Sequence, residues 1–264
     1  MAESIHPDAY MGPVALTVAD LARSRRYYVE RIGLSALEEQ DGALILGVVG
    51  RPLLYLYEQP GARQVHNTSG LYHFALLLPS RLELARTLQH LIDTGTPLTG
   101  ASDHAVSEAL YLSDPDGHGI EIYRDRPRSA WQYPRGVLKM TVDPFDAEGV
   151  LAELDDATAV DGGMPAGTVM GHVHLHVADL AAAEQFYVDV LGMDLMVRYG
   201  NMASFVAAGG YHHHVGLNIW AGVGAPPPPA DAARLRWDTL VLPDAEALAA
   251  VKTRLEATGS VVEQ

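Results

Sequence analysis

The 264-residue sequence contains no cysteine, which excludes disulfides and thiolate metal sites, so any bound metal must be held by nitrogen and oxygen atoms. It has no apolar run of membrane-spanning length. Basic residues are scarce, because 18 lysines and arginines face 33 acidic residues, for a formal charge of −15. That charge opposes binding to nucleic-acid phosphates and to anionic lipid surfaces. The first residues, MAESIHPDAY, also lack a signal-peptide pattern, so the sequence predicts a cytoplasmic protein that acts on a small molecule.

Internal repeats are the main organising feature of the chain. The segments GPVALTVADLARSRRYYVERIGL (12–34) and GHVHLHVADLAAAEQFYVDVLGM (171–193) each read as an alternating strand, then a helix that begins after an aspartate and ends at a glycine. A second pair, 72–95 and 236–259, reads as a strand ending in Leu-Pro and an amphipathic helix ending in Thr-Gly. Further strand-like runs follow the first three of these strand–helix segments, at 43–48, 53–58, 109–112, 119–124, 203–207 and 214–220.

The repeats predict four units, each a strand, a helix and further strands, of which the fourth lacks its last strands in this sequence. We expect units one and two over 10–125, and unit three with the incomplete unit four over 169–264. Between them, 126–168 is rich in proline, glycine and acidic residues and is predicted to be a connector. The proline-rich stretch 222–231 is predicted to be a stiff link between units three and four.

Two of these motifs indicate a family. The repeat with its FYVDVLG ending and the segment SDPDGHGIEIY (113–123) resemble the vicinal oxygen chelate superfamily, which includes glyoxalases, bleomycin-resistance proteins and extradiol dioxygenases. The segments GHVHLHVADL and YHHHVGL resemble more narrowly its catechol 2,3-dioxygenase branch. The resemblance implies an α+β fold of βαβββ modules, in which two modules form a cup-shaped mixed sheet around a divalent metal.

The resemblance also implies a metal site of two histidines and one glutamate, which holds Fe(II) or sometimes Mn(II). His73 and His172 occupy the first-strand positions of units two and three, and Glu121 occupies the last-strand position of unit two. The first-strand positions of units one and four hold Pro13 and Trp237, which cannot bind metal. We therefore predict that units two and three share the metal cup and that units one and four form a second, metal-free cup. Sharing between two chains of a swapped dimer is the alternative.

Further residues are expected around the open face of the metal. The resemblance assigns acid–base chemistry to His213, because an imidazole can take and return a proton near neutral pH. Tyr111 lies ten residues before Glu121, the interval at which this branch has a hydrogen-bonding tyrosine, and His104 precedes it on the same loop or strand. Both are expected to hydrogen-bond the substrate.

The alternation of side chains along a strand predicts where the other clustered histidines point. His174 is expected on the metal-facing side of its strand, where it contacts the site or the substrate, and His176 as a polar residue lining the cup. His212 and His214 are expected to point away from the middle histidine of the triplet, so the triplet cannot bind one metal without a bulge. His118, in the turn DPDGHG, is expected to be exposed.

The resulting hypothesis is an extradiol ring-cleaving dioxygenase that opens a catechol-type aromatic diol with O2. The first alternative is that the same metal and O2 chemistry degrades another planar heterocycle. The second alternative is a metal-dependent lyase or isomerase of the glyoxalase type, which would need another glutamate that HHHVGLNIW does not offer. The third is a metal-free, bleomycin-resistance-like protein that binds aromatic drugs. The expected partners are the diol, O2 and further copies of the chain, as a homodimer or higher homo-oligomer.

Overall fold

The computed structural model describes residues 4–155 and 160–260. The strands are β1 (Tyr10–Val18), β2 (Ser35–Gln40), β3 (Ala43–Val48), β4 (Arg51–Glu58), β5 (Gly70–Leu78), β6 (Gly100–Asp103), β7 (Ser107–Ser113), β8 (Gly119–Asp125), β9 (Val169–His176), β10 (Asp194–Tyr199), β11 (Ala203–Ala207), β12 (Val215–Asn218) and β13 (Arg234–Val241). The helices are α1 (Leu21–Arg26), α2 (Arg81–Asp93), α3 (Ala147–Leu151), α4 (Leu180–Gln185) and α5 (Ala245–Ala257). Short helical turns are η1 (Tyr27–Arg31), η2 (Arg128–Ala130), η3 (Pro134–Gly136) and η4 (Phe186–Val190).

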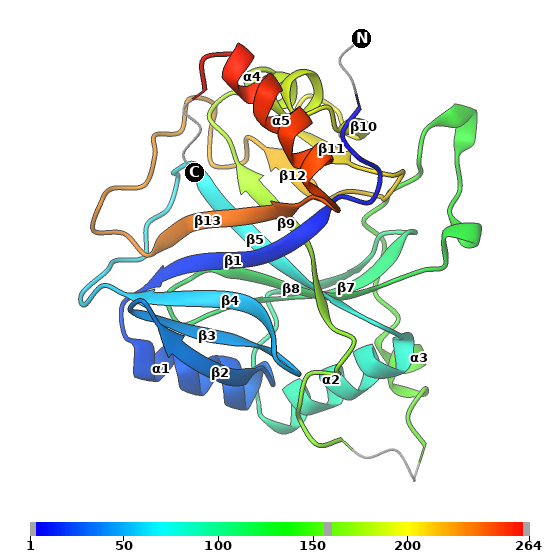
Figure 1. Ribbon diagram of the computed structural model, residues 1–264. Coiled ribbons are helices and arrows are strands. Elements are labelled where there is room, and N and C mark those ends of the chain that lie inside the picture. Colours follow the sequence, from blue (N-terminus) through cyan, green and yellow to red (C-terminus); the bar gives the residue numbers. More distant parts are fainter. Residues whose placement is uncertain (1–3, 156–159, 261–264) are drawn as a thin grey trace.

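The strands form two curled mixed sheets (Figure 1). The larger has the order β10-β11-β12-β9-β5-β8-β7-β6 and is built from units two and three, which meet where β5 and β9 pair antiparallel. The smaller has the order β13-β1-β4-β3-β2 and joins unit one to the single strand of unit four. The α+β fold and the predicted pairing of units two and three are thereby confirmed.

The helices that follow the first strands of units one and three begin and end as the repeat predicts. The carboxylates of Asp20 and Asp179 accept hydrogen bonds from backbone N–H groups of the first turns of α1 and α4. Both helices then widen into one π-helical turn, η1 and η4, which the sequence pattern did not indicate. Gly33 and Gly192 follow with φ of +88° and +81°, a conformation that glycine adopts without strain.

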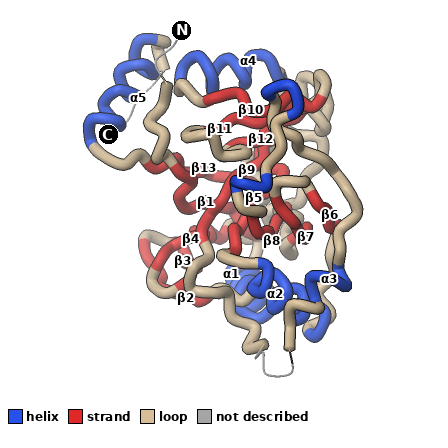
Figure 2. Tube along the Cα trace, turned by 90° about the vertical axis from the view of Figure 1, so that its right-hand side faces the viewer, coloured by secondary structure: helices blue, strands red, loops and turns tan. Residues whose placement is uncertain are grey.

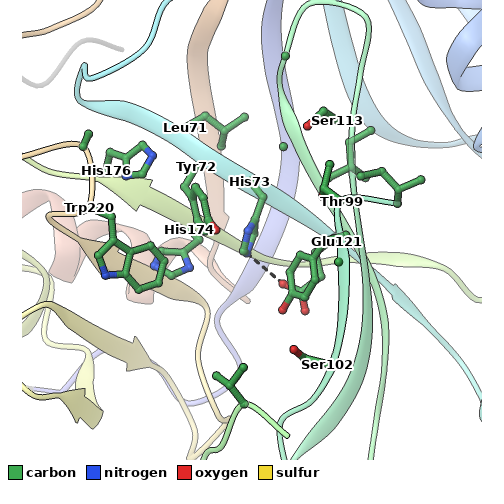
Figure 3. Close-up of a pocket in the computed structure, with 18 of the residues that line it drawn as sticks. Leu71, Tyr72, His73, Thr99, Ser102, Ser113, Glu121, His174, His176 and Trp220 are labelled. Atoms are coloured by element: carbon green, nitrogen blue, oxygen red, sulfur yellow. Dashed lines mark ion pairs between the residues drawn. The ribbon is translucent and has the colours of Figure 1, made fainter. Parts of the chain in front are cut away.

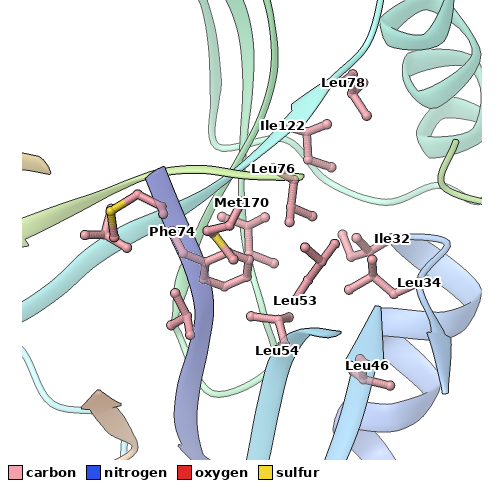
Figure 4. Packing of buried hydrophobic residues seen from close by; sticks show 14 of the residues in the cluster. Ile32, Leu34, Leu46, Leu53, Leu54, Phe74, Leu76, Leu78, Ile122 and Met170 are labelled. Carbon is pink, nitrogen blue, oxygen red and sulfur yellow. The ribbon is translucent and has the colours of Figure 1, made fainter. Parts of the chain in front are cut away.

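The core lies between the two sheets, and period-two alternation in β5 separates it from the cup (Figure 4). Phe74, Leu76 and Leu78 enter the buried cluster that also contains Leu54 of β4. His73, Ala75 and Leu77 face the opposite side of the larger sheet. The same strand therefore contributes both to the core and to the concave face of the cup.

The helices gather at the two ends of the molecule, with α1, α2 and α3 at one end and α4 and α5 at the other (Figure 2). None of them, within the described ranges, has the length and apolarity needed to cross a membrane. The sequence did not predict β2, β6 and β10. All three are edge strands without a fully buried residue, so they carry little of the apolar alternation that would indicate a strand.

Candidate metal centre

Three neighbouring strands, β8, β5 and β9, bring the predicted metal ligands to one face of the larger sheet. Ala75 of β5 pairs with Glu121 of β8 on one side and with His172 of β9 on the other. His73 precedes Ala75 by two residues and therefore points to the same face. Ala75 is fully buried, and its single methyl group leaves room for the three larger side chains above it.

The three side chains converge on one carboxylate oxygen. Nε2 of His73 lies 3.0 Å from Oε2 of Glu121 (Figure 3). Nε2 of His172 lies 3.1 Å from the same atom. One possible ligand atom from each residue lies within 4.8 Å of the others, and all three residues are buried. Nε2 of His73 has no hydrogen bond in this position despite its closeness to the carboxylate. A buried nitrogen aimed at a carboxylate oxygen without bonding it is suited to share a cation with that oxygen.

The charges of the group also suit a divalent cation. Burial lowers the pKa of His172 to about 4, so its imidazole is neutral at pH 7 and can present a lone pair. Burial alone would raise the pKa of Glu121, but His172 and His73 oppose it and hold that pKa well below its ordinary value. An ionised carboxylate thus lies buried between two imidazoles. Two nitrogens and one carboxylate on one face fit Fe(II) or Mn(II).

A cavity of about 780 Å³ opens over this face of the sheet. His73 and Glu121 line it, whereas His172 lies almost fully buried beside it. The structure brings the residues predicted for catalysis to the same cavity: His104, Tyr111, His174 and His213. Side chains from both units therefore surround a single space, with two of the three candidate metal ligands on its wall.

Tyr111 is held by a hydrogen-bond chain that fixes its proton. Nδ1 of His104 lies 2.6 Å from the carbonyl oxygen of Thr141, which can only accept, so Nδ1 carries the hydrogen. With one hydrogen on the ring, Nε2 is then an acceptor, and the hydroxyl of Tyr111 donates to it at 2.6 Å. Burial, followed by the charge of Glu121, raises the pKa of Tyr111, so the phenol stays protonated. Its oxygen retains lone pairs for a ligand in the cavity.

A second chain ends at His213. Nε2 of His212 lies 2.9 Å from a carboxylate oxygen of Asp125, which accepts its hydrogen. With one hydrogen on the His212 ring, Nδ1 is then an acceptor, and it receives a hydrogen bond from Nδ1 of His213 at 2.7 Å. Nε2 of His213 is left without a hydrogen. Burial, followed by the neighbouring His172, lowers the pKa of His213, so the ring is neutral and its remaining nitrogen is a proton acceptor.

Comparisons with known proteins agree with this geometry. A family model described as the glyoxalase/bleomycin resistance protein/dioxygenase superfamily matches residues 10–122, and one described as bleomycin resistance protein-like N-terminal matches 170–207. The catechol-2,3-dioxygenase of Bacillus subtilis (strain 168) is 48% identical over 266 residues, which cover 99% of this chain and 92% of that protein. The chain belongs to the glyoxalase/bleomycin resistance protein/dioxygenase superfamily.

Solved structures share the fold of this superfamily member. A proposed dioxygenase from Bacillus subtilis subsp. subtilis str. 168 matches with a TM-score of 0.65 and 14% identity, over 98% of this chain and 77% of that one. Glyoxalase I from Zea mays matches with a TM-score of 0.57 and 16% identity, over 97% of this chain and 83% of that one. At these identities the likeness extends to the fold alone.

In this superfamily member the histidine triplet departs from the sequence prediction. Strand β12 begins only at Val215, so His212, His213 and His214 lie in the preceding loop, where strand alternation does not apply. All three are buried. The expectation that His212 points away from His213 is wrong, because the two rings are hydrogen-bonded. His214 does turn elsewhere, and its Nδ1 accepts a hydrogen bond from the backbone N–H of Ala208.

The expectation that His118 is exposed is also wrong. The DPDG turn folds against unit one, where Nε2 of His118 donates to the carbonyl oxygen of Thr17 at 2.9 Å. The carboxylate of Asp114 accepts from the backbone N–H groups of Asp116 and His118. The turn is buried because it forms part of the contact between the two sheets, which a local turn signal does not reveal.

Several residues of the site were missed by sequence reasoning. Tyr123 and Asp125 follow Glu121 at intervals of two, and alternation along β8 places all three on the cup face. Tyr123 packs against His172 with ring centroids 4.9 Å apart, and Asp125 anchors the chain to His213 described above. The two-residue spacing could therefore have identified Tyr123 and Asp125 from the sequence. Tyr72 and Trp220, which also line the cavity, had no such signal, because they lie at a strand's beginning and in a loop.

Proposed function

We propose that this protein is an extradiol ring-cleaving dioxygenase that opens a catechol-type ring with O2 at a divalent metal held by His73, Glu121 and His172. The observation that carries the proposal is the convergence of two buried imidazole nitrogens on one carboxylate oxygen beside a cavity. The 48% identity to a protein named catechol-2,3-dioxygenase supports the same chemistry. When bound, the metal, Fe(II) or alternatively Mn(II), supplies a Lewis acid for the diol oxygens and activates O2.

His213 is proposed to be the acid–base residue. Its Nε2 is the acceptor that the chain through His212 to Asp125 leaves open, so it can take a hydroxyl proton from a bound diol and later return it. The carboxylate of Asp125 stabilises the arrangement by fixing which nitrogen of His212 carries hydrogen. We assign His212 and Asp125 as positioning residues, because their contacts run through His213.

Tyr111, His104 and His174 are proposed to orient the substrate. The hydroxyl oxygen of Tyr111 can accept a hydrogen bond from the second hydroxyl of a diol, while His104 holds the phenol in place. His174 lies beside His73 with ring centroids 5.1 Å apart, and burial lowers its pKa. A neutral ring there can pack against an aromatic substrate and keep water from the reacting atoms.

The glyoxalase-type alternative has less support. A fourth protein ligand of carboxylate type would have to come from the last strand of unit three, and β12 (Val215–Asn218) contains no acidic residue. The metal-free drug-binding alternative would leave a carboxylate buried between two imidazoles without a cation. We also retain as proposals the division into 10–125, 126–168 and 169–264, a cytoplasmic location and a homo-oligomeric assembly.

Anaerobic loading with Fe(II), in parallel with Mn(II), followed by addition of catechol and O2, tests the proposal. We expect one mole of O2 consumed per mole of catechol and a ring-opened product with a new absorption band. Glu121→Gln should abolish both, whereas His90→Gln, which changes a histidine on α2 away from the cavity, should keep them. Metal binding without O2 uptake on any catechol would contradict the proposal.

A further inference from the structure

An aromatic wall forms the side of the cavity next to the candidate metal ligands. Tyr72, His174, His176 and Trp220, defined here as the aromatic wall, lie together beside His73 (Figure 3). The ring centroid of Tyr72 is 5.2 Å from that of Trp220, 5.2 Å from that of His174 and 4.9 Å from that of His176. Residues from both units thus build one continuous aromatic surface.

Asn218 holds two members of this wall. Its side-chain oxygen accepts hydrogen bonds from Nδ1 of His176 at 2.7 Å and from the backbone N–H of Trp220 at 2.9 Å. Asn218 is fully buried, so these bonds are shielded from competing water. The wall is therefore fixed in place rather than assembled by chance from mobile side chains.

The wall retains surface for a ligand. Tyr72 is 40% exposed and Trp220 is 44% exposed, although large aromatic side chains are generally much more buried. The cavity of about 780 Å³ falls in the range of sites for drug-sized ligands, and a single catechol ring is far smaller. A catechol bound at His73 and Glu121 would leave the wall uncovered, so the space fits a ligand with a second planar group.

The same cavity is notable for its lack of permanently charged cationic side chains among the described residues. None of its lining residues, within the described part of the chain, is a lysine or an arginine. Arg124 and Arg126, which come from β8 and its end, instead form ion pairs with Glu108, whose side chain is buried away from the cavity. A carboxylate on the substrate would find no lysine or arginine among these lining residues to pair with, and its desolvation would oppose binding.

We propose, on the basis of the proposed ring-cleaving function, that the preferred substrate is a catechol carrying an uncharged aryl substituent. The diol end lies at His73 and Glu121, and the aryl group packs on Tyr72 and Trp220. Carboxylate-bearing catechols are rejected because no lysine or arginine of the described chain lines the cavity to pair with them.

The aryl preference is tested with the Fe(II)-loaded full chain, by O2 uptake on 3- and 4-phenylcatechol and on the corresponding methylcatechols. We expect kcat/KM for the better phenylcatechol to exceed that of its methyl counterpart by about 10-fold or more, as burial of an added ring predicts. Trp220→Ala should lower this ratio by about 10-fold, and Trp220→Phe should restore much of it. Tyr133→Ala, an exposed aromatic outside the cavity, is the matched control and should leave the ratio unchanged.

The charge preference is tested with 3,4-dihydroxyphenylacetate and its methyl ester, which differ in one negative charge and one methyl group. We expect the ester to be favoured by about 100-fold in kcat/KM. Calorimetric titration of the anaerobic metal-loaded enzyme should give the same order in Kd. This second readout does not depend on turnover.

The proposed substrate class and the proposed ring-cleaving function can be refuted separately. Turnover of catechol itself with equal rates for acid and ester, or a phenyl-to-methyl ratio that Trp220→Ala leaves unchanged, would overturn the substrate class and leave the ring-cleaving function standing. No O2 uptake with any of the catechols would overturn both.

Discussion

Replacing His214 by asparagine should make the metal-free protein less sensitive to acid. Nδ1 of His214 accepts a hydrogen bond from the backbone N–H of Ala208 at 3.1 Å, which requires an unprotonated nitrogen. Burial, followed by the charges of His212 and His172, lowers the pKa of His214 from its ordinary 6.5 to about 4. An asparagine oxygen can accept the same hydrogen bond and does not titrate in this range.

The sign and size follow from proton linkage. Between pH 6.5 and about 4 the unfolded chain binds a proton at position 214 that the folded chain does not, so the free energy of unfolding falls as the pH falls through this window. Each pKa unit corresponds to about 1.4 kcal/mol of free energy. His214 therefore lowers the free energy of unfolding by about 2 kcal/mol at pH 5 and by about 3 kcal/mol at pH 4. Above pH 6.5 it contributes no pH dependence.

The assay is urea unfolding followed by circular dichroism at several pH values between 7.5 and 4.5, with a chelator present to exclude metal. Between pH 7.5 and 5, the free energy of unfolding of the wild type should fall by about 2 kcal/mol more than that of His214→Asn, whatever the stability of the variant at pH 7.5. His66→Asn, which changes an exposed histidine in the loop before β5, is the matched control and should run parallel to wild type. Parallel curves for His214→Asn as well, within about 0.5 kcal/mol, would refute the reasoning.

Three further changes test the site. Glu121→Gln should weaken Fe(II) or Mn(II) binding by at least about 100-fold in anaerobic calorimetry, because the divalent ion loses its charged ligand; wild-type affinity would contradict the ligand assignment. His213→Asn should lower kcat by about 100-fold or more with little change in anaerobic catechol affinity, the effect of removing an acid–base residue; an unchanged kcat would exclude that role. Gly216→Ala should reduce kcat/KM, because a Cβ there would lie 2.8 Å from the ring of His174 and displace it; a crystal structure with the ring unmoved would contradict this cause.

The pairing of the units could be predicted from sequence because the ligands constrained it. Two first-strand histidines and one glutamate make a three-ligand site only if units two and three share a sheet, and the antiparallel contact of β5 with β9 fulfils this condition. The N-caps Asp20 and Asp179 were predictable for a different reason, since their signal is local. In both cases the information needed was contained in residue identity and spacing.

Other features depend on contacts that spacing does not encode. His118 is buried because its turn packs against β1, about a hundred positions away in sequence. His212 turns toward His213 because the loop before β12 follows no strand period and because Asp125 of another unit accepts its hydrogen. The strand-like appearance of 214–220 led to the wrong assignment, since a short apolar run does not reveal where pairing begins.

The proton positions link these contacts to the proposed chemistry. One hydrogen-bond chain ends at the carboxylate of Asp125 and the other at the carbonyl of Thr141, and neither end can donate. With one hydrogen on each imidazole, each chain directs its hydrogens away from the cavity, which leaves Nε2 of His213 and the oxygen of Tyr111 as acceptors. A diol brings two hydroxyl donors and complements such a site, whereas a ligand with only acceptors would leave both unpaired. The fixed acceptor ends thus favour a hydroxylated ring by the same hydrogen-bonding rules that orient the side chains.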